Sequence, residues 1–216
     1  MNVSKALKLY LVMGSTNCHV FDPEKTLAEA IEGGITLFQF REKGDDTLKE
    51  KDRLYLGQKL RQLCKKNKIP FIVNDDIELA LELQADGVHI GQDDSTPYKT
   101  RKQIGENMWM GISTHSVEEA QQAVKDGADY IGVGPMFPTK TKADAHQVVG
   151  PDLIKTIRRS GLEQFPIVGI GGITLDRANL VYEAGANGVA VISAISGAES
   201  PKQAAAEFLS LKATKI

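Results

Sequence analysis

The stretch LFQFREK, residues 37 to 43, places polar side chains where a buried strand would carry apolar ones. Successive side chains of a strand point to opposite faces, so Gln39, Arg41 and Lys43 share one face and the two phenylalanines share the other. Guanidinium and ammonium groups are the usual partners of phosphate, so this face predicts a site for a polyanion. The alternative is a solvated strand end, because long charged side chains are mostly exposed.

Two acidic clusters follow the next two predicted strands. The segment VNDD contains Asn74 and Asp75, and the segment GQDD contains Asp94. A helix cap explains one aspartate in each cluster, but it does not easily explain two clusters beside a cationic face. Mg²⁺ is usually held by one or two carboxylates, water and substrate phosphate oxygens. We therefore predict one Mg²⁺ per subunit, on Asp75 and Asp94.

The elements that must position these residues alternate regularly along the chain. The predicted strands cover residues 8–13, 36–42, 70–75, 87–91, 108–113, 130–135, 166–172 and 188–193. Amphipathic helical patterns separate them, and many of these patterns end in a glycine that stops a helix. Strict alternation predicts a parallel sheet with helical crossovers, and eight units fit a single-domain (β/α)8 TIM barrel over residues 1–216. A doubly wound open sheet is the alternative.

In a barrel of this kind the active site lies at the carboxyl ends of the strands, so we expect functional residues at the predicted strand ends. The loops after strands seven and eight commonly bind phosphate, and helix N-termini present free N–H donors to anions. The segments GIGGIT and ISAIS occupy these two places. We predict a second anion site there, held by backbone amides of Gly172, Ile192 and Ser193. The alternative for the glycines is a tight turn.

Two further strand ends carry hydroxyl groups. The segment PTKTK after the sixth strand, with Thr139, Thr141 and Lys142, predicts a lid over a ligand, and an exposed loop is the alternative. Ser113 ends the fifth strand without an obvious base partner, which favours a hydrogen-bonding role over a nucleophilic one. His89 lies within a predicted strand, and we predict a structural role for it.

The composition excludes several classes of protein. Lys plus Arg is 26 and Asp plus Glu is 28, a net charge of −2, so no electrostatic footprint for nucleic acid or an anionic membrane exists. No apolar run reaches the roughly 18 residues of a membrane span, and we expect a cytoplasmic protein.

The two cysteines, Cys18 and Cys64, are too few for a disulfide framework. Cys64 falls on the apolar stripe of a predicted helix, so we predict a buried thiol there. A homo-oligomer is compatible with this composition.

The motifs QFREK, VNDD, GVHIGQDD, GIST, GPMFPTKTK, VGIGGI and VISAIS follow one another in an order that resembles the thiamine-phosphate synthase family. The resemblance covers almost the whole chain, from LYLVM to AISGAESP. It implies a (β/α)8 transferase that joins 4-amino-2-methyl-5-pyrimidinylmethyl diphosphate to 4-methyl-5-(2-phosphoethyl)thiazole or its carboxylated form. Thiamine phosphate and pyrophosphate would be the products of a magnesium-assisted dissociative displacement.

The resemblance also implies roles for individual residues by motif position. The residues implied to hold the pyrimidine diphosphate or its leaving group are Gln39, Arg41, Lys43, Asn74, Ser113 and Lys142. Those implied to hold the thiazole phosphate are Thr139, Thr141, Gly172, Ile192 and Ser193. The same substrate-binding stretches include Phe40, Glu42 and Lys140. The metal would lie on Asp75 and Asp94, and Arg41, Lys43, Ser113 and Lys142 would be catalytic. Compared with the family pattern, the chain has one extra residue before FPIVGIGG, near residues 162–165, which is outside this site.

Two other functions remain open at the level of sequence. A thiazole tautomerase is a related barrel that binds the thiazole phosphate, but it would not need the complete QFREK, NDD and GQDD sets. A non-catalytic barrel that senses thiamine phosphates is the second alternative. No appended domain or basic surface run supports the sensor, and a metal site would serve it no obvious purpose.

Overall fold

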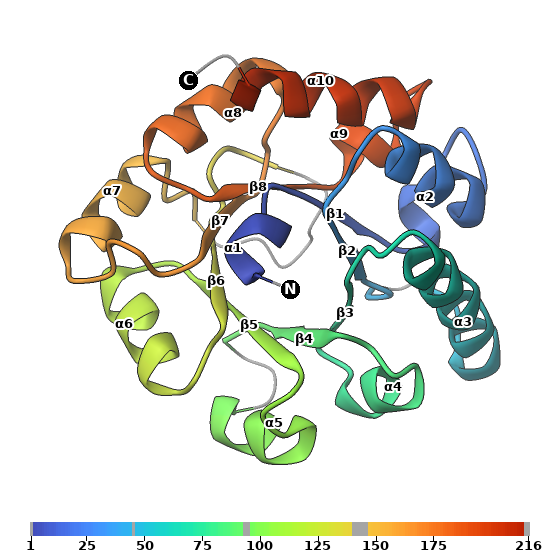
Figure 1. Cartoon of the computed structure of the whole chain (residues 1–216), viewed down its shortest axis with the longest axis horizontal. Helices are drawn as coiled ribbons and strands as arrows, with labels where there is room; N and C mark the ends of the chain where they lie inside the picture. The colour runs from blue at the N-terminus through green and yellow to red at the C-terminus, as the bar shows by residue number, and fades with distance from the viewer. Residues whose placement is uncertain (1, 45, 93–95, 140–146, 214–216) are drawn as a thin grey trace.

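Eight parallel strands close into a barrel whose order around the ring is the order along the chain (Figure 1). The computed structural model describes residues 2–44, 46–92, 96–139 and 147–213. The strands are β1 Leu9–Met13, β2 Leu37–Phe40, β3 Phe71–Asn74, β4 Gly87–Ile90, β5 Trp109–Thr114, β6 Tyr130–Val133, β7 Ile167–Ile170 and β8 Gly188–Val191. This closed ring confirms the predicted (β/α)8 barrel, and the open-sheet alternative is wrong.

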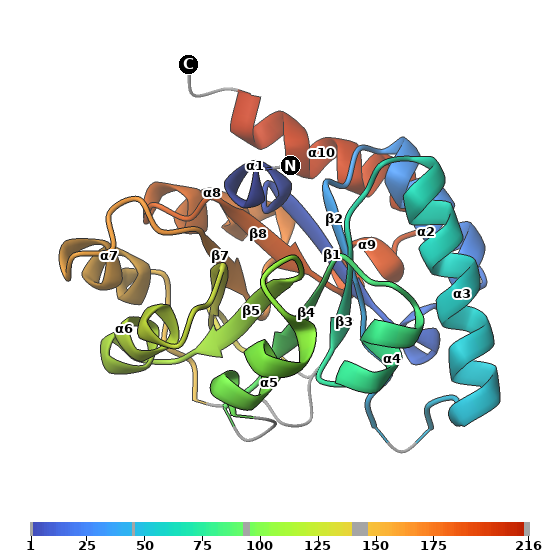
Figure 2. The same ribbon diagram turned by 60° about the horizontal axis from the view of Figure 1, so that its bottom comes forward.

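Every described helix except the first follows a strand and lies around the outside of the barrel (Figure 1). They are α1 Val3–Ala6, α2 Pro23–Glu32, α3 Glu50–Lys66, α4 Ile77–Glu82, α5 Pro97–Ile104, α6 Val117–Lys125, α7 Asp152–Arg159, α8 Leu175–Glu183, α9 Ser193–Ser196 and α10 Pro201–Ala213. Figure 2 shows α1 at one end of the barrel, where Ala6 and Leu7 are fully buried against the interior residues. In the described residues, no helix is long and apolar enough to cross a membrane.

Two apolar layers hold the barrel together, one inside the ring and one between the ring and the helices. Tyr10 and Tyr130 belong to the inner layer, while Phe38 and Phe40 belong to the outer one. Gln39 lies between the two phenylalanines in the chain and is 3% exposed. The prediction that the phenylalanines face the helices is therefore confirmed, and the polar face of β2 points into the barrel.

Short polar side chains begin several of the helices. Asp22 accepts a hydrogen bond from Lys25 N at 2.9 Å at the start of α2, and Asp76 accepts one from Leu79 N at 2.9 Å at the start of α4. Such caps satisfy backbone donors that have no partner within the helix. The cap alternative for the NDD cluster is thus correct for Asp76, which leaves Asp75 for another role.

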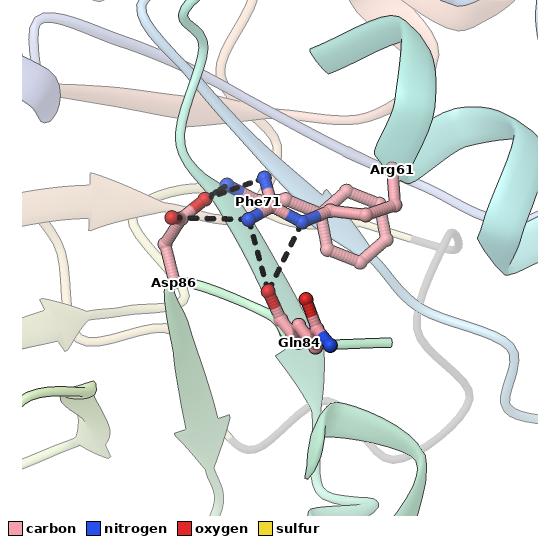
Figure 3. Close-up of polar contacts among 4 residues, drawn as sticks. All are labelled: Arg61, Phe71, Gln84 and Asp86. Carbon is pink, nitrogen blue, oxygen red and sulfur yellow. Dashed lines mark hydrogen bonds and ion pairs between the residues drawn. The ribbon is translucent and has the colours of Figure 1, made fainter. Parts of the chain in front are cut away.

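A network of hydrogen bonds around one arginine, which we call the arginine clamp, connects a helix to the amino end of the barrel. Arg61 of α3 donates to the carboxylate of Asp86, with Nη1 and Oδ2 2.9 Å apart, and to the carbonyl of Gln84 (Figure 3). Asp86 also accepts the backbone N–H of Phe71 at 2.7 Å, at the start of β3. The clamp therefore joins a helix, a turn and two neighbouring strands through one guanidinium group.

The clamp recurs twice further along the chain. Its later members are Arg101, Asp129 and Met110, and then Arg158, Asn187 and Ile167. In both of these later sets the acidic or amide oxygen accepts the arginine and also a backbone N–H within the first two residues of a strand, at 2.8 to 2.9 Å. All three clamps lie where strands start, so the opposite end of the barrel is left for polar groups with other partners.

Candidate active site

A cavity of about 600 Å³ opens at the carboxyl ends of the strands. This volume is ordinary for a site that takes small molecules. The predicted site residues that line it are Arg41, Lys43, Asn74, Asp75, Ser113, Thr139, Gly172, Ile192 and Ser193. The segments that end β2 and β3 contribute Arg41, Lys43 and Asp75, and the segments after β6 to β8 contribute glycines together with hydroxyl groups such as that of Thr139.

Arg41 lies just beyond β2, where its backbone continues the pairing with β1 and passes close to Gly14. Its backbone N–H donates to the carbonyl of Met13 at 3.0 Å, which extends the pairing of β1 and β2 by one residue. A Cβ atom at Gly14 would lie 2.1 Å from the carbonyl oxygen of Arg41, so only glycine fits at this position. Gly14 thus lets the Arg41 backbone pass over the end of β1, a requirement that the sequence pattern alone did not reveal.

Lys43 and Asp75 form an ion pair in the wall of the cavity. Lys43 Nζ lies 2.8 Å from Asp75 Oδ2, and Asn74 Nδ2 donates to the same oxygen at 2.6 Å. Asp75 has a φ of +60°, a left-handed conformation that aspartate tolerates better than most residues. Its backbone N–H donates to the carbonyl of His89 at 2.9 Å, which fixes the turn against β4. The carboxylate is therefore held in place before any ligand binds.

The donor chemistry of Asp75 fits a hard cation, as one oxygen ligand in a cavity wide enough for substrate phosphates. Asp94, the second predicted ligand, lies outside the described residues. Within the ranges that the structure describes, no three His, Cys, Asp or Glu side chains gather as a metal cluster. Asp75 alone would therefore need oxygen ligands from Asp94, the substrate or water.

Ser113 has a histidine partner that the sequence did not predict. His89 Nε2 lies 3.0 Å from Ser113 Oγ, and both side chains line the cavity. The neighbouring Val88 and Ile90 face the helices, so strand alternation points His89 into the barrel beside the next strand. This alternation in GVHIG was the signal that could have identified the pair. Gln92 adds a second contact here, from its Nε2 to the carbonyl of Ser113 at 2.6 Å.

The opposite wall of the cavity consists of a turn that only glycine can form. Gly171 and Gly172 have φ values of +97° and +63°. A Cβ atom at Gly172 would lie 2.6 Å from the carbonyl oxygen of Pro138 and 2.7 Å from that of Phe137. The turn therefore lets the loop after β7 pack against the loop after β6 while it lines the cavity.

Two more side chains in the wall were absent from the sequence prediction. Arg177 of α8 lies with its guanidinium carbon 5.3 Å from the centre of the Phe137 ring. His115 follows β5, and its Nδ1 lies 3.1 Å from Glu119 Oε2. Arg177 lies within a helix and His115 lies just before one. In the sequence, polar residues at such positions cannot be distinguished from those on the solvent-exposed face of a helix.

Some predicted site residues point elsewhere. Gln39 is buried, and its Nε2 donates to Tyr10 Oη at 2.7 Å. Phe40 packs against the helices, and Glu42 accepts hydrogen bonds from the backbone and hydroxyl groups of Ser15. The side chains of these three residues are not in the cavity wall, so their substrate contacts stay predictions. The predicted lid residues Lys140, Thr141 and Lys142 lie outside the described residues.

Comparisons with known proteins identify sequences that are similar to this chain. The family model described as thiamine monophosphate synthase matches residues 9–195. A thiamine-phosphate synthase of Bacillus velezensis is 54% identical over 202 residues, which cover 94% of this chain and 89% of that protein. One from Bacillus thuringiensis subsp. konkukian is 54% identical over 198 residues, which cover 92% of this chain and 89% of that protein.

A solved structure extends the likeness from sequence to fold. Thiamine phosphate pyrophosphorylase from Pyrococcus furiosus superposes with a TM-score of 0.86 at 34% identity, covering 99% of this chain and 98% of that one. The family model spans the residues from the first strand to the helix after the last one. The chain therefore belongs to the thiamine monophosphate synthase family.

Proposed function

We propose that this chain is a transferase of thiamine biosynthesis that forms thiamine phosphate from two phosphorylated substrates. The first is 4-amino-2-methyl-5-pyrimidinylmethyl diphosphate, and the second is 4-methyl-5-(2-phosphoethyl)thiazole or its carboxylated form. One observation carries the proposal: a single cavity joins the Arg41, Lys43 and Asp75 side chains to the glycine turn on its opposite wall. Residues 1–216 would form one catalytic domain, and the cytoplasmic location stays a prediction.

The cationic wall would bind the diphosphate of the pyrimidine substrate. Arg41 offers a planar fork of donors and Lys43 a mobile point charge, and both suit phosphate oxygens. Lys43 is 42% exposed and pairs with Asp75, so its ammonium group can turn toward a diphosphate without crossing the protein core. Lys142, whose position the structure does not describe, would add a third cation from the predicted lid.

Asp75, together with Asp94, would hold Mg²⁺ at this wall. The ion would neutralise negative charge on the diphosphate oxygens, which is its usual contribution to phosphate chemistry. Asn74 donates to Asp75 Oδ2 and would keep the carboxylate turned toward the cavity. Lys43 pairs with that same oxygen. With both ligands bound, Mg²⁺ would take the place of Lys43 beside Asp75, and Lys43 would pair with the diphosphate.

The reaction breaks one carbon–oxygen bond and forms one carbon–nitrogen bond. The bonding pair at the pyrimidine methylene leaves with pyrophosphate, and the electron-rich aminopyrimidine stabilises the resulting cation. The thiazole nitrogen then supplies the pair for the new bond, so no protein nucleophile is needed. Arg41, Lys43 and Ser113 would stabilise charge on the leaving group, at about 3 kcal/mol for each positioned donor.

The glycine turn and the start of α9 would bind the phosphate of the thiazole substrate. Gly172, Ile192 and Ser193 line the cavity, and their backbone groups lie where two strand ends meet the loops that follow. Thr139 also lines the cavity and would donate its hydroxyl to the same phosphate. Fixed positions for both substrates would bring the thiazole nitrogen in line with the methylene carbon.

A two-substrate assay tests this function. Purified protein is freed of metal with a chelator and supplied with both substrates, with and without added Mg²⁺, and pyrophosphate and thiamine phosphate are measured. We expect equal amounts of both products, and only with Mg²⁺. Ligand binding without turnover would favour a sensor, and rearrangement of the thiazole without pyrophosphate would favour a tautomerase. Product formation that survives chelation would remove the metal from the proposal.

A further inference from the structure

A continuous chain of hydrogen bonds runs through the barrel interior and ends in the cavity. Gln39 Nε2 donates to Tyr10 Oη at 2.7 Å, and Tyr10 Oη lies 3.0 Å from Tyr130 Oη. Tyr130 Oη lies 3.1 Å from His89 Nδ1, and His89 Nε2 lies 3.0 Å from Ser113 Oγ. The five residues come from β2, β1, β6, β4 and β5, so the chain depends on closure of the barrel.

The interior leaves space specifically for this chain. Tyr130 is fully buried, and its ring lies 5.5 Å from the His89 ring, centre to centre. A Cβ atom at Gly111 would lie 2.2 Å from Tyr130 Cζ and 2.5 Å from His89 Nδ1. A Cβ atom at Gly132 would lie 3.1 Å from His89 Cε1. Two glycines in neighbouring strands thus make room for the histidine and the tyrosine to meet.

The direction of the chain follows from the protons that each group carries. Burial raises the pKa values of Tyr10 and Tyr130 above that of a free phenol, so each is a neutral hydroxyl with one proton. Gln39 donates to Tyr10, so the proton of Tyr10 is available for Tyr130. When Tyr130 donates to His89 Nδ1, an imidazole with a single proton carries that proton on Nε2.

We infer that Tyr130 fixes His89 as the tautomer with its proton on Nε2, and that His89 then donates to Ser113 Oγ. The hydroxyl proton of Ser113 consequently points into the cavity as a hydrogen-bond donor. The opposite direction would make His89 a base for Ser113, which is the arrangement of a nucleophilic serine. His89, Tyr130 and Tyr10 are therefore positioning residues for a donor at the leaving group, and this last step rests on the proposed function.

Nuclear magnetic resonance of the free protein tests the tautomer without any substrate. The full chain is labelled with ¹⁵N in histidine, and long-range ¹H–¹⁵N correlations identify the protonated ring nitrogen. A His89→Gln variant assigns the signals among the four histidines of the sequence. We expect a single neutral tautomer with the proton on Nε2. A proton on Nδ1, or on both nitrogens, at neutral pH would overturn the inference even if the protein makes thiamine phosphate.

Tyrosine variants test the consequence for catalysis. Tyr130→Phe removes the donor to His89, so we expect mixed tautomers and a kcat about tenfold lower, with KM values nearly unchanged. Tyr10→Phe should have a smaller effect, because Tyr130 keeps its own proton for His89. Tyr98→Phe, at a position where the side chain is 76% exposed, is the matched control and should match the wild type.

The same variants separate a positioning role from a purely structural one. A Tyr130→Phe protein that keeps the wild-type tautomer and kcat would contradict the inference. So would one that loses kcat while the His89 signals stay unchanged. If Tyr130→Phe does not fold, as judged by circular dichroism, the wild-type spectrum still decides whether His89 carries its proton on Nε2. Ser113→Ala should lower kcat further than Tyr130→Phe and leave the tautomer of His89 in place, because the proton of His89 depends on Tyr130.

Discussion

Two adjacent aspartates take different roles because their backbones differ. Asp75 adopts a left-handed conformation and lines the cavity beside Lys43. Asp76 has an extended conformation, caps α4 and pairs with Arg53 at 2.9 Å. Both residues are aspartates, and the backbone of the turn after β3 directs their side chains to different places. This pair provides a matched test of the metal proposal.

We predict that Asp75→Asn lowers turnover by on the order of 10²-fold and raises the Mg²⁺ concentration needed for half-maximal activity. The change removes the negative charge and keeps the size of the side chain. Asp76→Asn should leave both quantities unchanged, because asparagine is an equally good helix cap. Initial rates measured over a series of Mg²⁺ concentrations decide between these outcomes. Equal Mg²⁺ dependence in Asp75→Asn and the wild type would show that Asp75 is no ligand.

At the scale of elements, the arginine clamps join helices to strand starts and leave the strand ends free. Two clamps use aspartate as the shared acceptor and the third uses asparagine. The acceptor oxygen is therefore the common requirement, and the full charge is not. Figure 3 shows the first clamp, in which Asp86 contacts both Arg61 and Phe71.

We expect Asp86→Ala to lower the free energy of unfolding by about 1–3 kcal/mol, because the N–H of Phe71 loses its side-chain acceptor and the Arg61 guanidinium keeps only the carbonyl of Gln84. Asp86→Asn keeps an acceptor oxygen and loses only the charge of a partly exposed ion pair, so its effect should stay below about 1 kcal/mol. Urea unfolding of both variants measures the difference. Equal destabilisation would mean that charge, and not the acceptor, stabilises the clamp.

The glycine turn after β7 permits a second prediction at this scale. Gly172→Ala should raise the KM for thiazole phosphate by about tenfold, which equals about 1.4 kcal/mol of binding free energy. The added Cβ meets the carbonyl oxygens of Phe137 and Pro138 and must displace the loop after β6. Gly161 also has a positive φ, but a Cβ there meets nothing within 4 Å. Gly161→Ala should therefore lower stability alone, and an equal rise in KM would contradict the assignment.

At the scale of the whole molecule, the fold was predictable because each of its units repeats one pattern. Alternation of apolar runs and helical stripes gave the strands and the barrel, and Cys64 proved to be fully buried as predicted. Alternation within β2 also gave the correct faces for Gln39 and Phe40. These features depend on neighbours in the chain, which the sequence shows directly.

Side-chain contacts between strands were not predictable in the same way. Ser113 and His89 meet because β4 and β5 pair in register, and Gln39 donates to Tyr10 because β1 and β2 do. Each contact depends on the size of residues elsewhere, such as Gly111, whose missing side chain leaves room for Tyr130 and His89. A single sequence does not give the distances between these residues. It predicted which side chains share a polar face, but it did not predict which of them would form hydrogen bonds with one another.

The central claim is that one wall of the cavity stabilises a departing diphosphate while the other binds the thiazole phosphate. Lys43→Gln tests it most directly, with Lys59→Gln as control, since Lys59 pairs with Glu24 on the helix surface. The kcat for thiamine phosphate and the Kd of thiazole phosphate, by calorimetry, are measured for both. We predict that Lys43→Gln lowers kcat by on the order of 10²-fold and leaves the Kd within about twofold. An unchanged kcat, or equal losses in kcat and affinity, would contradict the claim.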